Sequence, residues 1–527
     1  MLWLSIHLPQ LALEVFERTA ASTSSLLQLA VCDRLHVLLT NQGAQALGVH
    51  NGIKRATALA LAPDLLLIER DPTREQQALE QIACWLLQFT PSISLLSPAP
   101  NNGKAQRHQT ERHQSRTSLP NCGLLLEIEP SLRLFGGLDA LLGRVRSGLH
   151  ALGFSAQLAC APTARGAWLL SLQSDGVIAQ DQAQLNARLA ALPLALLDSA
   201  APHRDTFESI GTRTIKELQL LPRAGLARRF GHELLNELDQ ALGKKADPRA
   251  WFEAPPSYSA RLELLADIEN AEALLFAAHR LLIQMTGWLT ALHVAVRSFE
   301  LQGLHDDLPA TRMPIRMIEA SRDLARMHGL LRERLAVTQL PAPVHTLLLV
   351  CGEVVPLSLP NQELFPTLRS TQESLGRLIE RLQTRLGRQQ IQRLCVMQDH
   401  RPEAAYRFEE IDQAFELGSP PTTPMRSNTF TGSDPIALSS HSSLPRPLWL
   451  LRTPVPIGER NNRPYWGSTL NLLAGPERIE SGWWDGALVQ RDYFIAEDDA
   501  NVLYWIYRDR LGSADPGKGW FMQGRFG

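Results

Sequence analysis

The sequence predicts an α+β protein of several domains. Its 527 residues suffice for roughly three or four domains of about 150 residues each. Apolar, strand-like segments alternate with amphipathic helical segments over residues 1–182, and residues 183–250 are almost entirely helical in pattern. Residues 259–357 then return to strands and helices. We therefore expect a sheet domain, a helical domain and a second sheet-plus-helix domain in that order.

The first sheet domain is predicted from a series of short elements. "LWLSI" at residues 2–6 reads as an apolar strand, and residues 73–90 form a helical pattern that follows the start signals Asp71 and Pro72. The stretch "LLLEIEP" at residues 124–130 reads as a buried strand. A helix at residues 138–154, the strand "SAQLACAP" and a further helix complete a β-α-β alternation.

The composition favours a reduced, cytoplasmic protein. The six cysteines are widely spaced and form no CxxC pair, so neither a zinc ribbon nor a disulfide framework is expected. The start "MLWLSIHLPQ" has no basic segment or cleavage site of a signal peptide, and no stretch of about 18 uninterrupted apolar residues occurs. The formal net charge of -2 leaves nucleic-acid binding open, because such binding needs only a local basic face.

Two segments lack any periodicity. Residues 99–121 are polar and rich in His and Arg, which we interpret as a solvated insertion, with a weak nucleic-acid contact as the alternative. Residues 416–447 are rich in Pro, Ser, Thr and Gly and are predicted to be a linker. The aromatic-rich residues 448–527 form a separate module.

Two acids interrupt the strand "LLLEIEP". Strand alternation places Glu127 and Glu129 on one face. A carboxylate pair is typical of a metal site, and two-metal phosphoryl-transfer sites need several carboxylates from more than one strand. The alternative is a strand whose polar face meets solvent.

The order of these segments resembles that of the Y-family DNA polymerases over residues 1 to about 357. This resemblance implies a right-hand fold of palm, fingers, helical thumb and little finger. The division that we expect is palm-like 1–20 and 76–182, fingers-like 21–75, helical thumb with a helix-hairpin-helix 183–250, little finger 259–357, clamp-binding peptide and basic helix 358–415, linker 416–447, and C-terminal partner-binding module 448–527.

The resemblance also places the family's active-site positions on this chain. Ser5 and His7 stand where the first strand carries metal-binding aspartates, and "EIEP" matches Ser-Ile-Asp-Glu, so that Glu129 and Pro130 replace the acidic pair. In "NQGAQALGV" two glutamines replace the Tyr and Arg that hold the triphosphate, and in "CAPTARGAWLLS" a tryptophan replaces the second lysine. These last positions are Gln42, Gln45 and Trp168.

The replacements predict a degenerate active site. Serine is a weak neutral ligand, and proline offers no side-chain oxygen and no backbone N–H. Pro130 is also expected to bias Glu129 toward an extended backbone. One remaining carboxylate cannot hold two magnesium ions, and the cations that offset the triphosphate are missing. No catalytic activity, cofactor or bound metal is therefore expected. The alternative is a rebuilt site in which Glu127 and Glu129 join another acid such as Asp33.

DNA-binding features remain in the sequence. "IGTRTIKEL" resembles a helix-hairpin-helix, whose backbone N–H groups and helix N-terminus can bind phosphates without reading sequence; a plain helical turn is the alternative. The residues assigned to DNA binding are Gly211, Thr212, Arg213, Lys216, Arg228 and Arg229. Arginines of the little-finger-like region are a further candidate surface, with solvated positions as the alternative for some of them: Arg297, Arg312, Arg316, Arg322 and Arg326.

The segment "NQELFP" resembles the sliding-clamp-binding peptide of bacterial polymerases. The clamp-binding residues would be Asn361, Gln362, Glu363, Leu364 and Phe365, with Leu364 and Phe365 as apolar anchors. The helix that follows places Arg377, Arg381, Arg385 and Arg388 close to one face, which suits either solvent or a partner.

The C-terminal module resembles a narrower group. "DHRPEAAYRF", "GPERIESGWWDG", "RDYF" and "YWIYRD" are similar to segments of the inactive Y-family homologues of the bacterial damage-induced mutagenesis cassette. Most of the module's aromatic residues are expected in its core and a few as partner anchors. The candidate partner-binding residues are Trp483, Trp484, Tyr493, Trp505 and Trp520.

These resemblances imply a non-catalytic scaffold for error-prone translesion synthesis, cytoplasmic and associated with the nucleoid. The implied partners are primer-template DNA, the sliding clamp, a RecA-like accessory protein and a C-family error-prone polymerase. An active, low-efficiency lesion-bypass polymerase and a DNA-binding protein without a clamp link are the alternatives.

Overall fold

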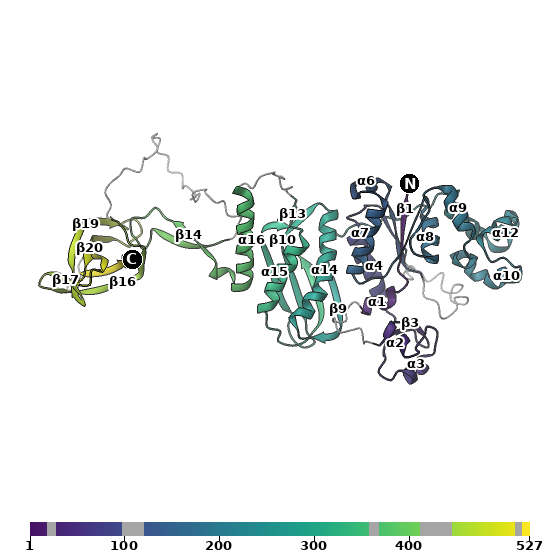
Figure 1. The fold of residues 1–527 in the computed structure, drawn as a ribbon, viewed down its shortest axis with the longest axis horizontal. Coiled ribbons are helices and arrows are strands. Elements are labelled where there is room, and N and C mark those ends of the chain that lie inside the picture. The colour runs from purple at the N-terminus through teal and green to yellow at the C-terminus, as the bar shows by residue number, and fades with distance from the viewer. Residues whose placement is uncertain (18–27, 97–120, 358–367, 412–444, 512–518) are drawn as a thin grey trace. The chain divides into compact units, whose positions relative to one another are not determined.

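The computed structural model describes residues 1–17, 28–96, 121–357, 368–411, 445–511 and 519–527 (Figure 1). The chain divides into two compact units, Met1–Arg385 and Leu386–Gly527. Helices and several separate sheets share the first unit, and the second consists mainly of strands. The predicted α+β multidomain class is confirmed. None of the helices in the described ranges has the length and apolar character that crossing a membrane requires.

The N-terminal sheet has the strand order β5-β6-β1-β7-β8. Its strands are β5 (Ile93–Leu96), β6 (Gly123–Glu127), β1 (Trp3–His7), β7 (Gln157–Ala161) and β8 (Val177–Ile178). The central strand β1 pairs antiparallel with both β6 and β7, and Ser5 stands opposite Leu125 and Ala159. All five residues of β1 are buried, as expected for a central strand that is covered on both faces.

Helices cover both faces of this sheet (Figure 1). Leu4 and Ile6 point to the face packed against α4 (Pro72–Leu86) and α7 (Leu138–Ala151). Trp3 and Leu125 belong to the opposite face, which packs against α8 (Ala164–Gln173). Strand alternation therefore puts Ser5, His7 and Trp3 on the α8 face.

A small sheet of order β3-β2-β4 is inserted between β1 and α4. It contains β2 (Leu29–Cys32), β3 (Val37–Thr40) and β4 (Leu66–Glu69), with α2 (Gln42–Ala46) and α3 (Arg55–Leu61) packed on it. Asn41 caps α2 by accepting a hydrogen bond from the N–H of Ala44. One face of this sheet has a core of its own, whereas Leu29, Val31 and Leu39 on the other face belong to the core of the N-terminal sheet.

A helical region follows the N-terminal sheet. It contains α9 (Gln182–Ala190), α10 (Arg204–Ser209), α11 (Ile215–Leu220), α12 (Arg223–Phe230) and α13 (His232–Ala241). Residues from these helices share one core with α8. The chain then crosses the N-terminal sheet, where Phe252 N–H bonds the carbonyl of Ile93 at 2.7 Å and Trp251 stacks on Trp3 with 6.0 Å between ring centroids.

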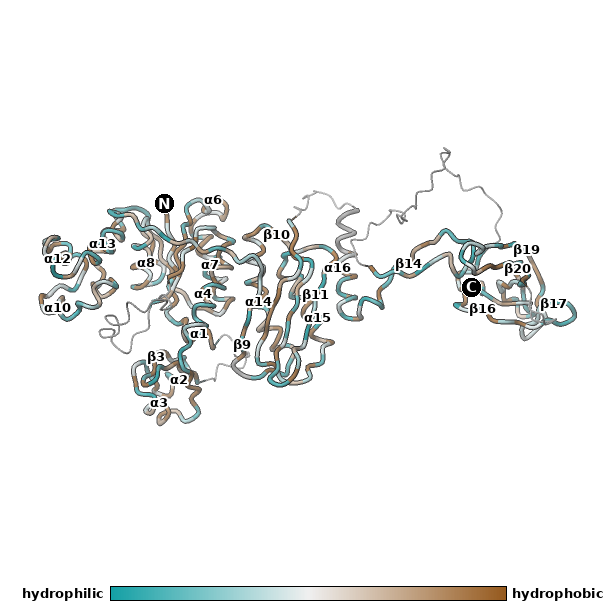
Figure 2. Tube along the Cα trace, turned by 180° about the vertical axis from the view of Figure 1, so that it is seen from behind, coloured by the Kyte–Doolittle hydropathy of each residue, from teal (hydrophilic) through white to brown (hydrophobic). Residues whose placement is uncertain are grey.

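The second sheet has the order β11-β10-β12-β9, with β13 (Val354–Pro356) also paired to β10. Its long strands are β9 (Ser259–Ile268), β10 (Val294–Leu304), β11 (Thr311–Ser321) and β12 (Val344–Cys351). Apolar residues of these strands pack against α14 (Ala271–Ala291) and α15 (Leu324–Val337) on one face, and the strands are among the brown segments of Figure 2. The arginine-bearing positions of β11 therefore lie on the other, open face.

The second sheet is held against the N-terminal sheet by α14 and α4. Trp85 of α4 fits between two glycines: a Cβ on Gly148 of α7 would lie 2.0 Å from its ring, and a Cβ on Gly287 of α14 would lie 2.7 Å from it. Gln284 donates to Gln81 across the same contact. Glycine at both positions is what admits the indole.

Helix α16 (Leu368–Leu386) docks on the second sheet through Glu380. Its carboxylate is 1% exposed and accepts hydrogen bonds from the N–H of Ile318 at 2.6 Å and from Arg326 Nε at 3.0 Å. Ile318 lies on β11, the edge strand. The carboxylate thus covers part of an otherwise open sheet edge.

The C-terminal unit contains a hairpin and a seven-stranded sheet. The hairpin pairs β14 (Gln392–Val396) with β15 (Tyr406–Glu410). The sheet runs β18-β17-β16-β22-β21-β20-β19. Its strands are β16 (Trp449–Arg460), β17 (Arg463–Trp466), β18 (Ser468–Thr469), β19 (Asn471–Ser481), β20 (Val489–Glu497), β21 (Leu503–Asp509) and β22 (Trp520–Arg525).

Candidate functional site

Ser5, His7 and Trp168 meet on the α8 face of the N-terminal sheet. Ser5 is fully buried, and its Oγ lies 2.8 Å from Ser171 Oγ, which in turn donates to the carbonyl of Trp168. The His7 imidazole contacts the Trp168 indole edge-on, with 5.5 Å between ring centroids. These three residues are among the positions that the family resemblance singled out. The fold brings them together in a packed interior.

The Trp168 indole occupies the space beside β6. A Cβ on Gly123 would lie 2.6 Å from the indole ring, so only glycine fits there. Trp168 and His7 are both buried. Burial lowers the pKa of His7, although hydrogen bonds with the Gln157 side-chain oxygen and the backbone of Ser171 act in the opposite direction. A neutral imidazole in an apolar contact is a packing element.

The expected placement of Glu127 and Glu129 on one strand face is wrong. Strand β6 ends at Glu127, and Glu129 begins the 3-10 turn η2 (Glu129–Ser131). Pro130 lies in the first positions of this turn, where its missing N–H costs no hydrogen bond. The expected extended backbone at Glu129 is likewise not observed. Glu129 is exposed and pairs with the N-terminal amine of Met1.

The described residues hold no group of three or more His, Cys, Asp or Glu side chains that could bind a metal ion. Gln42 and Gln45 lie on α2, in the small sheet unit rather than beside Ser5. Gln45 donates to the carbonyl of Thr40 at 3.0 Å. Asp33, the acid invoked for a rebuilt site, accepts hydrogen bonds from the N–H groups of Leu35 and His36 in its own turn. These contacts give Gln45 and Asp33 a local role.

The predicted hairpin joins α10 to α11. Gly211 has a φ of 76°, which glycine adopts without strain, and Thr214 and Glu217 form a capping box at the start of α11. The Glu217 carboxylate accepts from the N–H of Arg213 at 2.6 Å and of Thr214 at 3.1 Å. These N–H groups hold the pKa of Glu217 below its usual value.

This geometry changes how the hairpin could meet DNA. The N–H groups of Gly211 and Thr212 donate to the carbonyls of Glu208 and Phe207, and Thr212 is buried. The turn's donors are therefore engaged inside the protein, contrary to the expected backbone contact with phosphate. The exposed cations remain available: Arg213, Lys216, Arg228 and Arg229.

The arginines of the second sheet divide into two groups. Arg297, Arg312 and Arg316 are exposed, and Arg316 stands opposite Ser298 on the open face of the sheet. Arg326 is instead paired with the buried Glu380. Arg322 is half-buried and its Nη1 has no hydrogen-bond partner among the described residues. Arg326 is therefore a tether for α16 and not part of an open basic surface.

The residues predicted to bind the clamp lie outside the described part of the chain. Asn361, Gln362, Glu363, Leu364 and Phe365 fall between β13 and α16. Of the basic residues that follow, Arg377, Arg381 and Arg385 lie on α16 and Arg388 begins the 3-10 turn η5 (Arg388–Gln390). Arg381 pairs with Glu333 of α15 at 3.1 Å.

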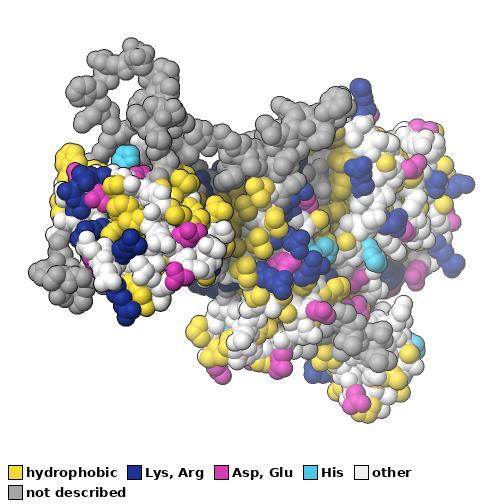
Figure 3. All heavy atoms as spheres, turned by 60° about the vertical axis from the view of Figure 1, so that its left-hand side comes forward, with side chains coloured by type: hydrophobic (Ala, Val, Ile, Leu, Met, Phe, Trp, Pro, Cys, Tyr) yellow, Lys and Arg dark blue, Asp and Glu magenta, His cyan; other side chains and the backbone are white. Residues whose placement is uncertain are grey.

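The aromatic residues of the C-terminal unit also divide into two groups. Tyr493, Trp505 and Trp520 are buried, and Tyr493 stacks on Trp505 with 4.3 Å between ring centroids. Trp483 and Trp484 are 79% and 54% exposed. Hydrophobic side chains are visible on the surface of this unit in Figure 3. The three buried residues build the sheet, so of the five candidates a partner could directly reach Trp483 and Trp484.

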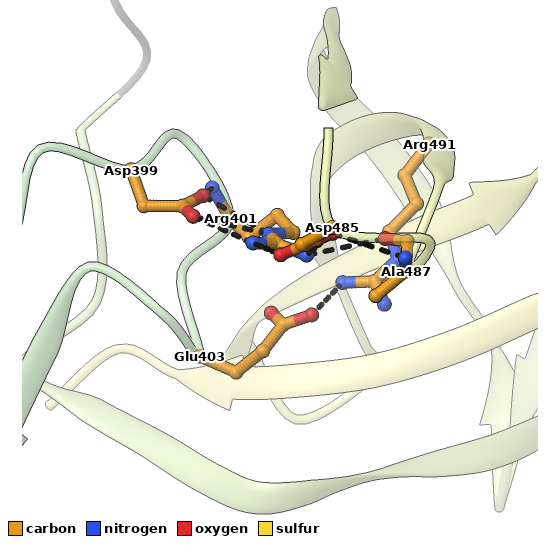
Figure 4. A network of polar contacts seen from close by, with 6 residues as sticks. All are labelled: Asp399, Arg401, Glu403, Asp485, Ala487 and Arg491. Carbon is orange, nitrogen blue, oxygen red and sulfur yellow. Dashed lines mark hydrogen bonds and ion pairs between the residues drawn. The ribbon is translucent and has the colours of Figure 1, made fainter. Parts of the chain in front are cut away.

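A network of polar contacts surrounds Arg401, beside the tryptophan pair Trp483 and Trp484. Figure 4 shows the polar residues of this network. The Arg401 guanidinium bonds Asp399 at 2.7 Å and Asp485 at 2.6 Å and donates to the carbonyl of Ala487 at 3.2 Å. It also lies over the Trp484 ring, 5.7 Å from its centroid. The guanidinium lowers the pKa of the Asp399 and Asp485 carboxyls.

Sequence reasoning did not assign this network a role. The signal was present, because Asp399 and Arg401 lie in "DHRPEAAYRF" and Asp485 follows the tryptophan pair in "GPERIESGWWDG". Opposite charges in two motifs that lie far apart in the sequence could form an ion pair. Only the structure shows which residues are paired. A second link, between Arg491 and Glu403 at 2.8 Å, fixes the same loop to β20.

Comparison with known proteins finds sequence similarity along most of the chain. No family model matches. "Protein ImuB" from two strains of Caulobacter vibrioides, NA1000 / CB15N and ATCC 19089, is 26% identical over 501 residues, which cover 91% of this chain and all of the relative. Among solved structures, a Dbh ternary complex and DinB from Sulfolobus solfataricus are each 14% identical, covering 68% of this chain and the whole of theirs, with TM-scores of 0.37 and 0.36. The resemblance drawn from the sequence motifs is confirmed, since the chain is similar to protein ImuB along most of its length.

Proposed function

We propose that this chain is a non-catalytic, polymerase-like scaffold for error-prone translesion DNA synthesis. In this role it binds primer-template DNA without sequence preference, docks on the sliding clamp, and recruits a RecA-like accessory protein and a C-family error-prone polymerase. It acts in the cytoplasm, at the nucleoid. The proposal combines the relationship to ImuB with the packing of the N-terminal sheet.

The observation that carries the proposal is the packed interior around Ser5. Two magnesium ions about 4 Å apart need several converging carboxylates and room for a triphosphate. At the corresponding face Ser5 is fully buried and Trp168 is 3% exposed. Glu129, the acid that the sequence match retains, points outward to the N-terminal amine. Both the ligands and the space for the reaction are thus lacking at this face of the described structure.

DNA binding is proposed through side chains on two surfaces. Arg213 and Lys216 stand on the hairpin between α10 and α11, and Arg228 and Arg229 on the last turn of α12. Arg316 lies on the open face of the second sheet. Exposed cations of this kind bind backbone phosphates and give an affinity that falls steeply with salt. Because no base-reading element is invoked, the binding is expected to be independent of sequence.

Clamp and partner contacts are assigned to different segments. Leu364 and Phe365 would anchor the clamp contact, and alanine at both positions should abolish it while DNA binding is retained. The exposed Trp483 and Trp484 would anchor the partners, because aromatic side chains dominate small interfaces. Unchanged clamp binding by the double alanine variant would remove the docking claim.

The alternative function is an active, low-efficiency lesion-bypass polymerase. It would require Trp168 and the β1 face to repack so that carboxylates could converge, at the cost of a buried apolar core. Primer extension by the purified chain, with magnesium or manganese and all four nucleotides, separates the two functions. The matched control is Glu129→Ala, which removes an exposed acid.

We expect no extension above that control, in an assay where an unrelated active polymerase extends the same primer. Extension that disappears in Glu129→Ala would show a working metal site and overturn the scaffold proposal. Electrophoretic mobility shifts on the same primer-template, repeated with scrambled sequences, test the DNA-binding part separately. Sequence-dependent binding would contradict it.

A further inference from the structure

A basic cluster lies where α14 and α15 pack together, on the helical side of the second sheet. His279 of α14 and His328 of α15 meet edge-on, with 4.9 Å between ring centroids. Arg280 follows His279, and Arg332 lies one turn beyond His328. We call these four residues the helix-side cluster. It occupies the face opposite the open surface that carries Arg316.

Two buried polar atoms of this cluster lack partners within the described structure. His279 Nδ1 and Arg280 Nη1 are buried and make no hydrogen bond to any described residue. The Arg280 guanidinium instead lies over the Phe276 ring, 5.0 Å from its centroid. Buried donors in native proteins nearly always have a partner, so an unmatched guanidinium N–H beside an imidazole suggests a ligand or ion.

Among the described residues, no acid acts on the two histidines of the cluster. The charged groups that act on His279 are His328 and Arg280, and Arg332 acts on His328. The acid of α15, Glu333, is paired with Arg381. The strands beneath α14 turn apolar side chains toward it.

Helix α4, which also packs against α14, brings no free carboxylate to the cluster either. Its Glu75 is paired with Arg70, and its Glu80 is not among the charged groups that act on His279 or His328. Its Arg74 is paired with Glu263. The cluster is therefore an uncompensated positive site in the described structure.

We propose that His279, Arg280, His328 and Arg332 form a binding site for a phosphate group. Arg280 and Arg332 supply permanent charge, and a guanidinium can present two parallel N–H donors to the oxygens of one phosphate. The two imidazoles add N–H donors when protonated. The phosphate can belong to a free anion or to a nucleic-acid backbone, and the experiment below distinguishes these sources. The site lies apart from Ser5 and Trp168 and goes beyond the proposed scaffold function.

The site is expected to bind more tightly as the pH falls. Burial and the neighbouring cations lower the pKa of His279 and His328, so both imidazoles are mainly neutral near pH 7 in the free protein. A bound dianion favours the protonated forms and raises their pKa. Binding and proton uptake are therefore linked, and the affinity falls as the pH rises from 6 to 8.

Isothermal titration calorimetry on the full chain tests the proposal with sulfate, whose charge is constant between pH 6 and 8. We expect sulfate binding at pH 6 that weakens at pH 8. Arg280→Gln should weaken it about tenfold or more, the effect of losing one or two hydrogen bonds to a charged group. Arg280→Lys should retain part of the affinity. Circular dichroism and thermal melting of each variant establish that it is folded.

The matched control is Arg261→Gln, which removes an exposed arginine from β9 of the same sheet. It should leave sulfate binding unchanged. Absence of sulfate binding at pH 6, or equal losses in Arg280→Gln and Arg261→Gln, would overturn the site.

Titration with an oligothymidine then identifies the source of the phosphate. Lost oligonucleotide affinity in Arg280→Gln would assign the site to nucleic acid, and retained affinity with lost sulfate binding would assign it to a small free anion. Failure of the proposed DNA binding would appear separately, as an oligonucleotide affinity that is indifferent to Arg213, Arg228 and Arg316.

Discussion

The Trp168 indole lies edge-on to the His7 imidazole, with 5.5 Å between ring centroids and 87° between ring planes. One residue comes from a helix and the other from the central strand of the sheet. Their contact fills the face on which a metal-dependent polymerase would need carboxylate ligands and open space for its substrate. The face to which the sequence resemblance assigned metal ligands is thus a packed core.

Returning an acid to this face should destabilise the protein rather than activate it. Ser5→Asp would place a carboxylate in a fully buried position among apolar neighbours. We expect a loss of about 3–5 kcal/mol in the free energy of unfolding, the cost of an unpaired buried charge. Urea unfolding followed by circular dichroism measures it. Ser5→Ala, which removes only the hydrogen bond to Ser171, should lose about 1 kcal/mol. Similar losses in the two variants would contradict the packing argument.

Glu14 is expected to make stability depend on pH. Burial raises the pKa of its carboxyl to about 7, although the N–H of Ser155 donates to it. The folded pKa exceeds the unfolded one, so the folded state binds more protons and unfolding becomes easier as the pH rises from about 4.5 to 7. The total loss is about 3 kcal/mol. Glu14→Gln should flatten this part of the profile when unfolding is measured at several pH values. A variant that keeps the wild-type slope would assign the effect to another group.

The ion pair between Arg326 and Glu380 should control the docking of α16. Glu380→Ala leaves Arg326 unpaired and uncovers the N–H of Ile318, and we expect a loss of about 3–5 kcal/mol. Hydrogen exchange at the Ile318 amide should accelerate. Arg381→Ala, which breaks an exposed pair with Glu333, should cost about 0.5 kcal/mol. The prediction fails if both variants exchange at the wild-type rate.

The two classes of tail tryptophan should respond differently to substitution. Trp505→Ala removes a fully buried indole and should cost about 3–5 kcal/mol. Trp483→Ala changes a 79% exposed side chain, so stability should be preserved while capture of the accessory protein is lost. Thermal melting and a pull-down on the same preparations measure the two effects. Undiminished capture by a Trp483→Ala, Trp484→Ala double variant would exclude the pair as an anchor.

The sequence predicted the grouping of Ser5, His7 and Trp168 because motif order carries long-range information that hydrophobic periodicity does not. It misplaced Glu129 because alternation does not indicate where a strand ends. Pro130 was the available signal, since proline is favoured in the first turn of a helix. The roles of Arg326 and Arg401 could not be predicted. An exposed arginine and one that pairs with a buried acid look alike in sequence, and the partners Glu380 and Asp485 are 54 and 84 residues away.

The two glycines around Trp85 restrict how this chain can diverge. Any side chain at Gly148 would overlap the indole, so a change there is tolerated only with a smaller residue at 85. At Gly287 a Cβ would also lie 2.9 Å from the Cα of residue 85, so glycine is required there whatever side chain stands at 85. A protein that exchanged its second sheet for that of another protein would therefore need a glycine at this contact on α14.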